Sequence, residues 1–392
     1  MRPIAVTGIG VVSAAGRGAR ASRDAAFEGR SSLGPLTRFR SPRCGHFPVA
    51  EAREVAGDPA VSRTVALGRI ALAEAIEASG IDPEALRTAG IAAGTCVGGM
   101  TETEDAIAAI LSGGSPDPAV WRRHECGSVT AALADGAGLE GPALTVSNAC
   151  SSGAQAIATA ADLIDAGEAE VMVAGGADAL CLLTLNGFAS LLAMDPEGCR
   201  PFDRDRKGMS LGEGAAFLVL EGLDRARARG ARIQALIAGF ANTCDAHHPT
   251  APDPEGKGIE AAVGTALEMA GIAPGAVDYV NAHGTGTPDN DRAEGRALSR
   301  IFAGAVPPVS STKRVFGHTL AATGAIEAAL CILAIRDGFL PGNCGLVDPD
   351  PDCAIVPLAA SRPGRPRAIL SNSFGFGGNN TVLCIASPDL AP

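Results

Sequence analysis

Cys150 is the residue of this 392-residue chain that is best placed to act as a nucleophile. It lies in the segment Thr-Val-Ser-Asn-Ala-Cys-Ser-Ser-Gly-Ala, between a short apolar run and an Ala-rich stretch that predicts a helix. A free thiol is only a few per cent thiolate at neutral pH, but the start of a helix favours the anion and lowers the thiol pKa. The alternative is a small buried cysteine without chemistry, which is what most of the other ten are expected to be.

Two of the six histidines, His283 and His318, also follow apolar runs and stand at turns. The first lies in Asn-Ala-His-Gly-Thr-Gly-Thr-Pro and the second in Lys-Arg-Val-Phe-Gly-His-Thr-Leu. An imidazole with a pKa of about 6.5 is mostly neutral at pH 7 and can donate one N–H. Each histidine alone would more often be a core residue, but a cysteine and two histidines on corresponding turns together indicate one site.

Lys313 and Glu327 stand on either side of His318 in the sequence, five residues before it and nine residues after it. A partly buried lysine needs an anionic partner. The spacing therefore predicts a Lys313–Glu327 ion pair, with a solvent-exposed lysine on a loop as the alternative.

The densest group of glycines lies in residues 371–380, which read Ser-Asn-Ser-Phe-Gly-Phe-Gly-Gly-Asn-Asn, between predicted strands 367–370 and 381–385. Glycine allows the backbone to approach a ligand closely, although a tight hairpin would explain the same residues. Phe374 and Phe376, two of only twelve phenylalanines, favour the ligand.

Short Val- and Ile-rich runs alternate with Ala-rich helical stretches, which predicts an α/β fold with largely parallel sheets covered on both faces. The predicted strands are residues 3–12, 89–97, 143–146, 170–174 and 216–220. The predicted helices are residues 63–79, 151–166 and 319–336, each followed by a glycine that suits a helix end.

A weak internal repeat indicates two related halves. The strand, turn and helix around Cys150 (144–166) resemble those around Lys313 and His318 (308–336), and residues 92–98 resemble 280–286. Two such halves, joined near a charged helix at 223–231, would bring equivalent turns together at a shared centre.

Composition excludes several classes of function. With 32 Lys and Arg against 43 Asp and Glu, the net charge is −11, and without a basic stripe nucleic acid is not an expected partner. No apolar run is long enough to span a membrane and no secretory signal is visible, while eleven scattered cysteines suit a reducing cytoplasm. The adjacent His and Cys pairs lack the spacing of a zinc site, and Gly8-Ile-Gly10 lacks the third glycine of a dinucleotide site, so we expect no metal and no cofactor.

Three motifs together resemble the β-ketoacyl-acyl-carrier-protein synthases, the condensing enzymes of fatty-acid and polyketide assembly. They are Asn-Ala-Cys-Ser-Ser-Gly, Asn-Ala-His-Gly-Thr-Gly-Thr and Lys-x-x-x-Gly-His, in that order, and residues 200–208 and 211–215 add to the likeness. The resemblance implies an α/β, thiolase-like fold of two pseudo-duplicated halves in five layers, α-β-α-β-α. Residues 1–222 would carry the nucleophile, and residues 232–392 the histidine pair and the lysine.

The resemblance also implies a role for each motif residue. Cys150 would accept the acyl chain, His283 and His318 would serve decarboxylation, and Lys313 with Glu327 would support the site electrostatically. The backbone N–H groups of Cys150 and Phe376 would form the oxyanion hole, with Phe376 also gating the acyl pocket. Substrate binding would involve Thr285, Thr287, Phe374 and Phe376.

The reaction so implied is the decarboxylative Claisen condensation of an acyl-enzyme thioester with malonyl-acyl-carrier protein, without cofactor or metal. The partners would be acyl- and malonyl-acyl-carrier proteins. The chain would form a homodimer, or a heterodimer with a chain-length partner. A local basic patch would bind the acidic carrier protein, and the residues expected to contribute are Arg63, Arg69, Arg122, Arg123, Arg204, Arg206 and Lys207.

Three related proteins are the alternatives. A thiolase carries a second catalytic cysteine in the C-terminal Gly-rich segment, which here has none; an initiating condensing enzyme has Asn where this chain has His318; and a non-catalytic chain-length partner lacks the nucleophile. The short stretch 186–200 and the pair Asn379-Asn380 leave both fatty-acid elongation and a specialised polyketide or aryl polyene pathway open.

Overall fold

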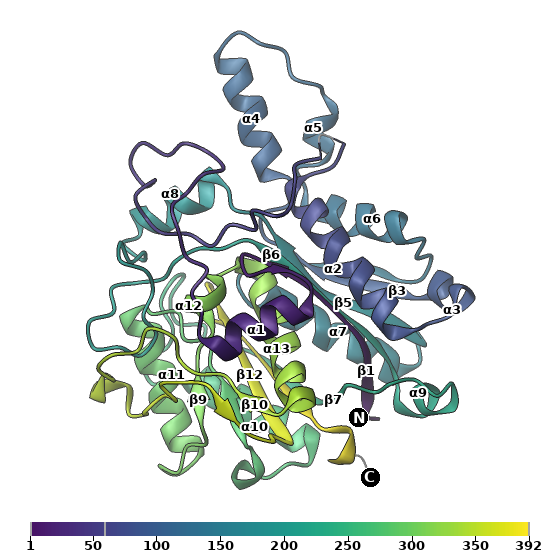
Figure 1. The fold of residues 1–392 in the computed structure, drawn as a ribbon, viewed down its shortest axis with the longest axis vertical. Coiled ribbons are helices and arrows are strands. Elements are labelled where there is room, and N and C mark those ends of the chain that lie inside the picture. The colour runs from purple at the N-terminus through teal and green to yellow at the C-terminus, as the bar shows by residue number, and fades with distance from the viewer. Residues whose placement is uncertain (1, 59, 391–392) are drawn as a thin grey trace.

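The computed structural model describes residues 2–58 and 60–390, whose main strands form one continuous mixed sheet (Figure 1). The strands of its first half are β1 (Ile4–Ser13), β3 (Gly90–Gly94), β4 (Ala143–Val146), β5 (Val171–Asp178) and β6 (Gly214–Gly222). The strands of its second half are β7 (Ala235–Cys244), β8 (Tyr279–Asn281), β9 (Val309–Ser310), β12 (Ala368–Gly375) and β13 (Asn379–Ala386). Apart from these strands, β2 (Gly16–Arg17) pairs with β1, and β10 (Phe339–Leu340) pairs with β11 (Arg362–Pro363).

The two halves have the same strand order. Outward from the centre of the sheet, the first half runs β1, β6, β5, β3, β4 and the second runs β7, β13, β12, β8, β9. If the five strands of each half are numbered in chain order, both halves have the same order from the centre outward: first, fifth, fourth, second, third. The directions match as well, because the inner pairs are antiparallel and the outer pairs are parallel in both halves. The weak sequence repeat therefore corresponds to a repeated arrangement of strands in the two halves.

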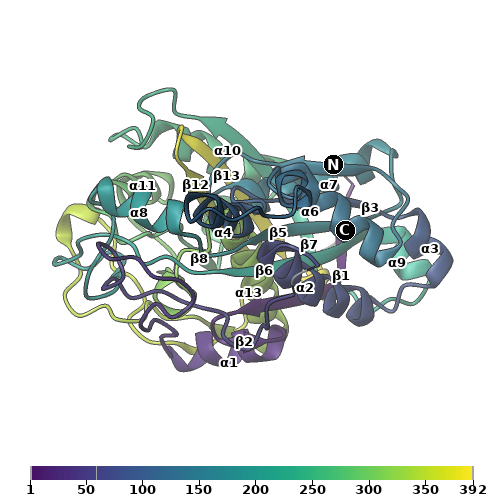
Figure 2. The same cartoon turned by 90° about the horizontal axis from the view of Figure 1, so that it is seen from above.

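Helices cover the sheet in layers, and Figures 1 and 2 show them from two directions. The helices are α1 (Ala19–Glu28), α2 (Arg63–Ser79), α3 (Pro83–Thr88), α4 (Met100–Leu111), α5 (Ala119–Arg122), α6 (Cys126–Ala137), α7 (Ser152–Ala166), α8 (Leu182–Ser190), α9 (Leu223–Ala228), α10 (Lys257–Ala270), α11 (Pro288–Ile301), α12 (Lys313–Phe316) and α13 (Thr323–Asp337). Helices α2 and α6 pack on the outer face of the first half, and α10 and α11 on that of the second. Helices α7 and α13 lie between the halves, which completes five layers, α-β-α-β-α.

Two glycines allow the central helices to approach each other closely. A Cβ on Gly153 of α7 would lie 3.2 Å from the backbone N of Ala325, and one on Gly324 of α13 would lie 2.9 Å from that of Ala154. The contact is reciprocal, as expected for equivalent helices of two related halves. It brings the N-termini of α7 and α13, and the turns that precede them, to one place.

The structure corrects two sequence expectations about the elements. The sheet is mixed rather than largely parallel, since antiparallel pairs occupy its centre. The helix expected at 319–336 begins only at Thr323, because Leu320 has a φ of 52° and the chain forms a 3-10 turn at Leu320–Ala322 first. The helix expected at 63–79 is present with those bounds. None of the helices in the described residues combines the length and the apolar character needed to cross a bilayer.

Candidate active site

Cys150 stands in the sharp turn between β4 and α7. The preceding residue, Ala149, has a φ of 60°, a left-handed conformation that non-glycine residues adopt at a cost of about 1–3 kcal/mol. A Cβ on Gly375 of β12 would lie 3.1 Å from the backbone N of Cys150, so this glycine allows β12 to pass directly against the turn. The glycine-rich segment therefore approaches the nucleophile's own backbone.

Burial controls the ionisation of Cys150. It raises the pKa of the thiol to about 12, although the charge of Lys313 and the backbone N–H groups of Cys150 and Phe376 act in the opposite direction. The sequence expectation that the helix N-terminus would lower this pKa is thus wrong, because desolvation of the thiolate outweighs the stabilising groups. The resting residue is a neutral thiol, with two N–H groups directed toward its sulfur.

Cys150, His283 and His318 line a single cavity of about 230 Å³. The other residues expected at the site, Thr285, Thr287, Phe374 and Phe376, line the same cavity. The imidazole rings of His283 and His318 meet edge to face, with their centroids 5.5 Å apart. The structure thus brings together side chains from both halves.

The backbone of His283 is fixed by a buried carboxylate. Glu294 on α11 accepts hydrogen bonds of 2.8 Å from the N–H groups of both His283 and Gly284, and Asn372 of β12 donates to it at 3.0 Å. Burial raises the pKa of Glu294 to about 7. The turn that follows β8 is therefore held in place by a carboxylate beneath it, and the imidazole extends into the cavity.

The hydrogen bonds of His318 determine its tautomer. Its Nδ1 accepts a hydrogen bond from the backbone N–H of Leu320 at 3.2 Å and lies 3.0 Å from the hydroxyl of Thr323. A nitrogen that accepts from a backbone N–H carries no proton, so the proton of the neutral ring is on Nε2. That Nε2 is buried and has no hydrogen-bond partner among the described residues. It is an N–H donor free to bind a substrate oxygen.

Both imidazoles are neutral at physiological pH. Burial lowers the pKa of His283 and of His318 well below the usual range, and the positive charge of Lys313 lowers both further. A neutral imidazole keeps one N–H and adds no charge to the cavity.

The predicted Lys313–Glu327 pair is confirmed. The two buried groups lie 2.7 Å apart, Nζ to Oε1, and the ammonium also donates to the backbone carbonyl of His283. Burial raises the pKa of Glu327 to about 7, while the charge of Lys313 opposes this. The lysine thus connects α12 to the β8 turn and to α13.

The two phenylalanines of the glycine-rich segment have different surroundings. Phe374 is buried, with its ring centroid 5.5 Å from that of His283. Phe376 is half-buried and its ring lies 5.4 Å from that of Phe188 on α8. Gly377 and Gly378 then turn the chain with φ values of 83° and 78°. The hairpin interpretation is therefore confirmed for Gly377 and Gly378, whereas Gly375 permits a close approach to the turn of Cys150, and its approach to a ligand stays a prediction.

Comparison with known proteins decides the family. Residues 1–226 match the family model described as "Beta-ketoacyl synthase, N-terminal domain" and residues 234–347 match "Beta-ketoacyl synthase, C-terminal domain". The chain belongs to the β-ketoacyl synthase family. Its members are acyl-transferring condensing enzymes of fatty-acid and type II polyketide synthesis, and their known reaction is condensation with malonyl-acyl-carrier protein.

Individual relatives of this synthase come from both pathways. It is 37% identical to a 3-oxoacyl-[acyl-carrier-protein] synthase 2 of Coxiella burnetii, over 98% of each chain. Among solved structures, it resembles the ishigamide ketosynthase/chain length factor, with a TM-score of 0.94, 34% identity, and 98% and 99% of the two chains covered. It also resembles a type II polyketide ketosynthase that is bound to the hexaketide and in complex with its acyl-carrier protein, with a TM-score of 0.91, 26% identity, and 98% and 99% coverage.

The prediction that a basic patch binds the carrier protein is wrong for two of the residues expected in it. Arg63 is buried against Glu213, with an Nη2–Oε1 distance of 2.6 Å. Arg206 is buried between Asp350, at 2.5 Å, and Asp291, at 3.5 Å. Neither guanidinium of this synthase faces a partner, because each balances a carboxylate inside the fold.

Two other members of the patch are exposed but paired with acidic residues. Arg204 lies 2.9 Å from Asp348, and Lys207 lies 3.0 Å from Glu197. The partners reduce the positive charge that these residues could offer. The remaining members stay a prediction, and they are Arg69, Arg122 and Arg123.

Sequence reasoning missed two buried carboxylates of the synthase, Glu294 and Asp178. Asp178 ends β5 and accepts hydrogen bonds from Thr95, Val97 and Ala321. A signal for each exists in the sequence: Asp178 ends an otherwise apolar run, and Glu294 shares a helix face with Ala297 and Leu298.

Proposed function

We propose that this synthase condenses an acyl group held on Cys150 with malonyl-acyl-carrier protein, releasing CO2 and a β-ketoacyl-acyl-carrier protein. The observation that carries the proposal is the single cavity lined by one thiol and two imidazoles. The roles of the individual residues below are parts of the same proposal.

In the first step the acyl chain moves from a carrier-protein thioester to Cys150. The sulfur attacks the carbonyl, and the thiol proton ends on the released carrier thiol, so the exchange is balanced. The developing oxyanion binds the backbone N–H groups of Cys150 and Phe376, which point toward the sulfur in the resting enzyme. One such donor is worth about 3–4 kcal/mol of transition-state stabilisation.

In the second step malonyl-carrier protein loses CO2, and its thioester becomes an enolate with charge on oxygen. His283 and His318 donate N–H groups to that oxygen. The unpartnered Nε2 of His318 and the low pKa of both rings support this role, since a neutral ring donates without releasing its proton. The enolate carbon then attacks the acyl-Cys150 carbonyl, and the thiolate that leaves is reprotonated from solvent.

Thr285 and Thr287 hold the arm that carries the substrate. Their hydroxyls lie 2.8 Å apart at the wall of the cavity, next to His283. Two adjacent hydroxyls can bind the amide groups of a phosphopantetheine arm.

The partners are acyl- and malonyl-carrier proteins and a second synthase subunit, in the cytoplasm. Strand β4 is the last in the sheet order, and its residues alternate between exposed and half-buried. An unpaired edge of this kind is a template for a neighbouring chain, which supports a homodimer. The resemblance to a ketosynthase/chain length factor makes a heterodimer the second outcome of a mass measurement in solution. The eleven cysteines, all among the described residues, are free thiols, as expected in a reducing compartment.

The test is mass spectrometry of the purified protein after incubation with a panel of acyl-carrier proteins. We expect one acyl group on the peptide that contains Cys150, followed by β-ketoacyl product when malonyl-carrier protein is added. Acylation of another cysteine, or of none with any member of the panel, would contradict the proposal. The chain length that loads fastest separates fatty-acid elongation from a specialised pathway.

A further inference from the structure

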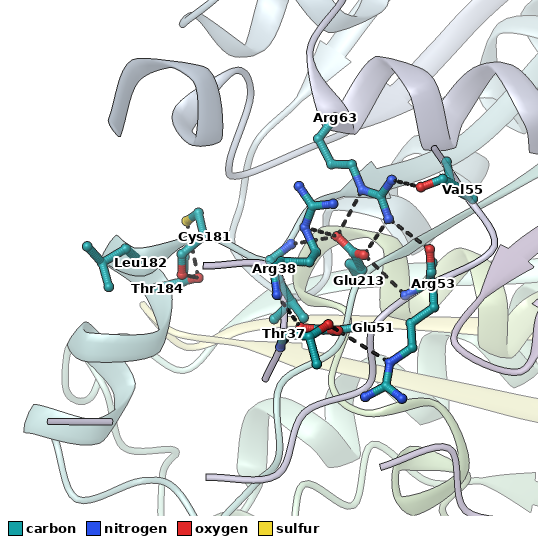
Figure 3. Close-up of polar contacts among 12 residues, drawn as sticks. Thr37, Arg38, Glu51, Arg53, Val55, Arg63, Cys181, Leu182, Thr184 and Glu213 are labelled. Atoms are coloured by element: carbon teal, nitrogen blue, oxygen red, sulfur yellow. Dashed lines mark hydrogen bonds and ion pairs between the residues drawn. The ribbon is translucent and has the colours of Figure 1, made fainter. Parts of the chain in front are cut away.

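We propose that the buried ion pair Arg63–Glu213 positions His318 for decarboxylation, so that Glu213 is a positioning residue of the reaction. This inference rests on the proposed function, because it needs His318 to act on malonyl-carrier protein. It arises from a cluster of buried charges outside the cavity, which the reaction itself does not use (Figure 3).

The pair is doubly hydrogen-bonded and fully enclosed. Arg63, at the start of α2, donates to Glu213 through Nη2 at 2.6 Å and Nε at 3.3 Å, and both side chains are almost completely buried. Glu213 also accepts hydrogen bonds from the backbone N–H groups of Ala52 at 3.1 Å and Leu180 at 3.2 Å. Figure 3 shows the carboxylate of Glu213 next to the guanidinium groups of Arg63 and Arg38. The carboxylate therefore holds three separate segments of the chain together.

Glu213 is joined to His318 through the residues immediately before it. The backbone N–H of Gly212 donates to the carbonyl of His318 at 2.9 Å, and the N–H of His318 donates to the carbonyl of Ser210 at 2.7 Å. On the opposite edge, the N–H of Glu213 donates to the carbonyl of Ala50 at 3.0 Å, and the N–H of Ala50 donates to the carbonyl of Leu211 at 2.9 Å. The segment 210–213 thus lies between His318 and Ala50, like a short strand in a sheet.

The segment 210–213 packs so closely against residues 316–318 that the two cannot move independently. A Cβ on Gly212 would lie 2.4 Å from the carbonyl oxygen of Phe316, and one on Gly317, whose φ is 69°, would lie 2.8 Å from that of Leu211. Backbone meets backbone at both points, so a displacement of segment 210–213 displaces His318 with it.

The nucleophile depends on a different set of contacts. Cys150 lies just before α7, and Gly375 passes closely against its backbone. Neutralising Glu213 leaves Arg63 buried without its anion, and rearrangement around Arg63 then moves segment 210–213. We expect decarboxylation to fall while acyl transfer to Cys150 is retained.

The chain offers a matched control in β6, the strand that begins directly after Glu213. Glu221 in β6 is also fully buried, and it pairs with Arg225 and Arg229. Glu221→Gln removes a buried carboxylate of the same kind without touching segment 210–213. This variant therefore measures how the loss of buried ion pairs alone affects the rates of decarboxylation and acylation.

The experiment compares Glu213→Gln, Glu221→Gln and the wild type in two assays of the full-length protein. One assay measures CO2 release from malonyl-carrier protein, and the other measures the rate at which Cys150 is acylated by acyl-carrier protein. For Glu213→Gln we expect the ratio of decarboxylation to acylation to fall at least tenfold, in kcat rather than in KM for malonyl-carrier protein. For Glu221→Gln we expect the ratio to stay within twofold of the wild type, whatever its unfolding midpoint.

Equal losses in both assays for Glu213→Gln, or no loss in either, would overturn the inference. Should Glu213→Gln fail to fold, Arg63→Lys keeps a cation beside Glu213 and allows the same measurement, with an expected fall in the ratio of about threefold; an unchanged ratio would again overturn the inference. A wild-type protein that neither acylates Cys150 nor releases CO2 would contradict the proposed function itself, which separates the two failures.

Discussion

The backbone N–H of Leu320 donates a hydrogen bond to Nδ1 of His318, and it does so from a left-handed residue, with a φ of 52°. The next residue, Ala321, donates its own N–H to the buried carboxylate of Asp178 at 2.9 Å. A carboxylate at the end of β5 in the first half thereby stabilises the turn that fixes the tautomer of a histidine in the second half.

Removing the imidazole of His318 should slow decarboxylation. Loss of one preorganised donor to a developing oxyanion costs about 10²–10³ in rate, so His318→Ala should lower CO2 release from malonyl-carrier protein by that factor. His318→Asn should retain more activity, because its amide still carries N–H donors. Normal CO2 release by His318→Ala, with only acyl transfer impaired, would contradict the assigned role.

Removing the thiol of Cys150 should separate the two half-reactions. Cys150→Ala should abolish condensation, since no acyl-enzyme can form, and should leave decarboxylation of malonyl-carrier protein measurable. The measurement is product formation alongside CO2 release. Cys384→Ala, which alters a buried thiol on β13, is the matched control and should load an acyl group as the wild type does. Continued chain extension by Cys150→Ala would refute the nucleophile assignment.

Breaking the Lys313–Glu327 pair from one side should be costly. Lys313→Met leaves a buried carboxylate without its cation, which typically destabilises a protein by about 3–5 kcal/mol. The double variant Lys313→Met/Glu327→Gln should recover a large part of that loss, because no unpaired charge remains. Urea unfolding of the two single variants and the double variant measures the coupling, and additive losses would show that the pair does not interact.

The neutral state of His318 should be visible in the pH dependence of stability. Its pKa is lower in the folded protein than in the unfolded chain, so below about pH 6.5 the unfolded chain binds a proton that the native protein does not. Stability from this group is present above pH 6.5 and falls, by up to about 1.4 kcal/mol per pH unit, as the pH decreases toward the folded pKa. The free energy of unfolding of the wild type relative to His318→Asn should therefore decrease from pH 7.5 to pH 5.5. A constant difference would mean that His318 titrates normally.

Adding a methyl group at Gly375 should disturb the nucleophile more than the fold. The new Cβ would lie 3.1 Å from the backbone N of Cys150 and 3.2 Å from the Cβ of Ala149, so the turn must shift by a few tenths of an ångström. Gly375→Ala should thus slow acylation of Cys150 at least tenfold. Gly264→Ala on α10, where a Cβ meets nothing within 4 Å, should leave the rate unchanged and stabilise the protein by about 0.5–1 kcal/mol. Equal acylation rates in the two variants would disprove the constraint.

The chain's local patterns predict much of this architecture. The helix at 63–79 follows from its apolar spacing and the glycine after it, and the strand at 143–146 follows from a short apolar run; the structure has both with those bounds. Sheet direction was predicted wrongly because a buried apolar run has the same pattern in a parallel and an antiparallel sheet. The limits of the two halves, 1–222 and 232–392, stay a prediction.

The sequence likewise predicts some features of the site and not others. Cys150, His283, His318 and Lys313 stand in recognisable segments, and the ion pair of Lys313 follows from its apolar setting. Asp178 could not be assigned its role, since its partner Ala321 lies 143 residues further along the chain. The pKa of Cys150 was misjudged for a related reason: the nearby helix start is visible in the sequence, whereas the extent of desolvation depends on every segment that surrounds the thiol.

The cavity draws its sulfur from one repeat and both imidazoles from the other. Neither repeat alone holds all the groups that condensation needs, so a half-folded chain cannot join an acyl group on Cys150 to an extender unit. Condensation by this enzyme therefore requires that both halves are folded and packed together. A substitution that separates α7 from α13 should abolish condensation before it unfolds the rest of the molecule.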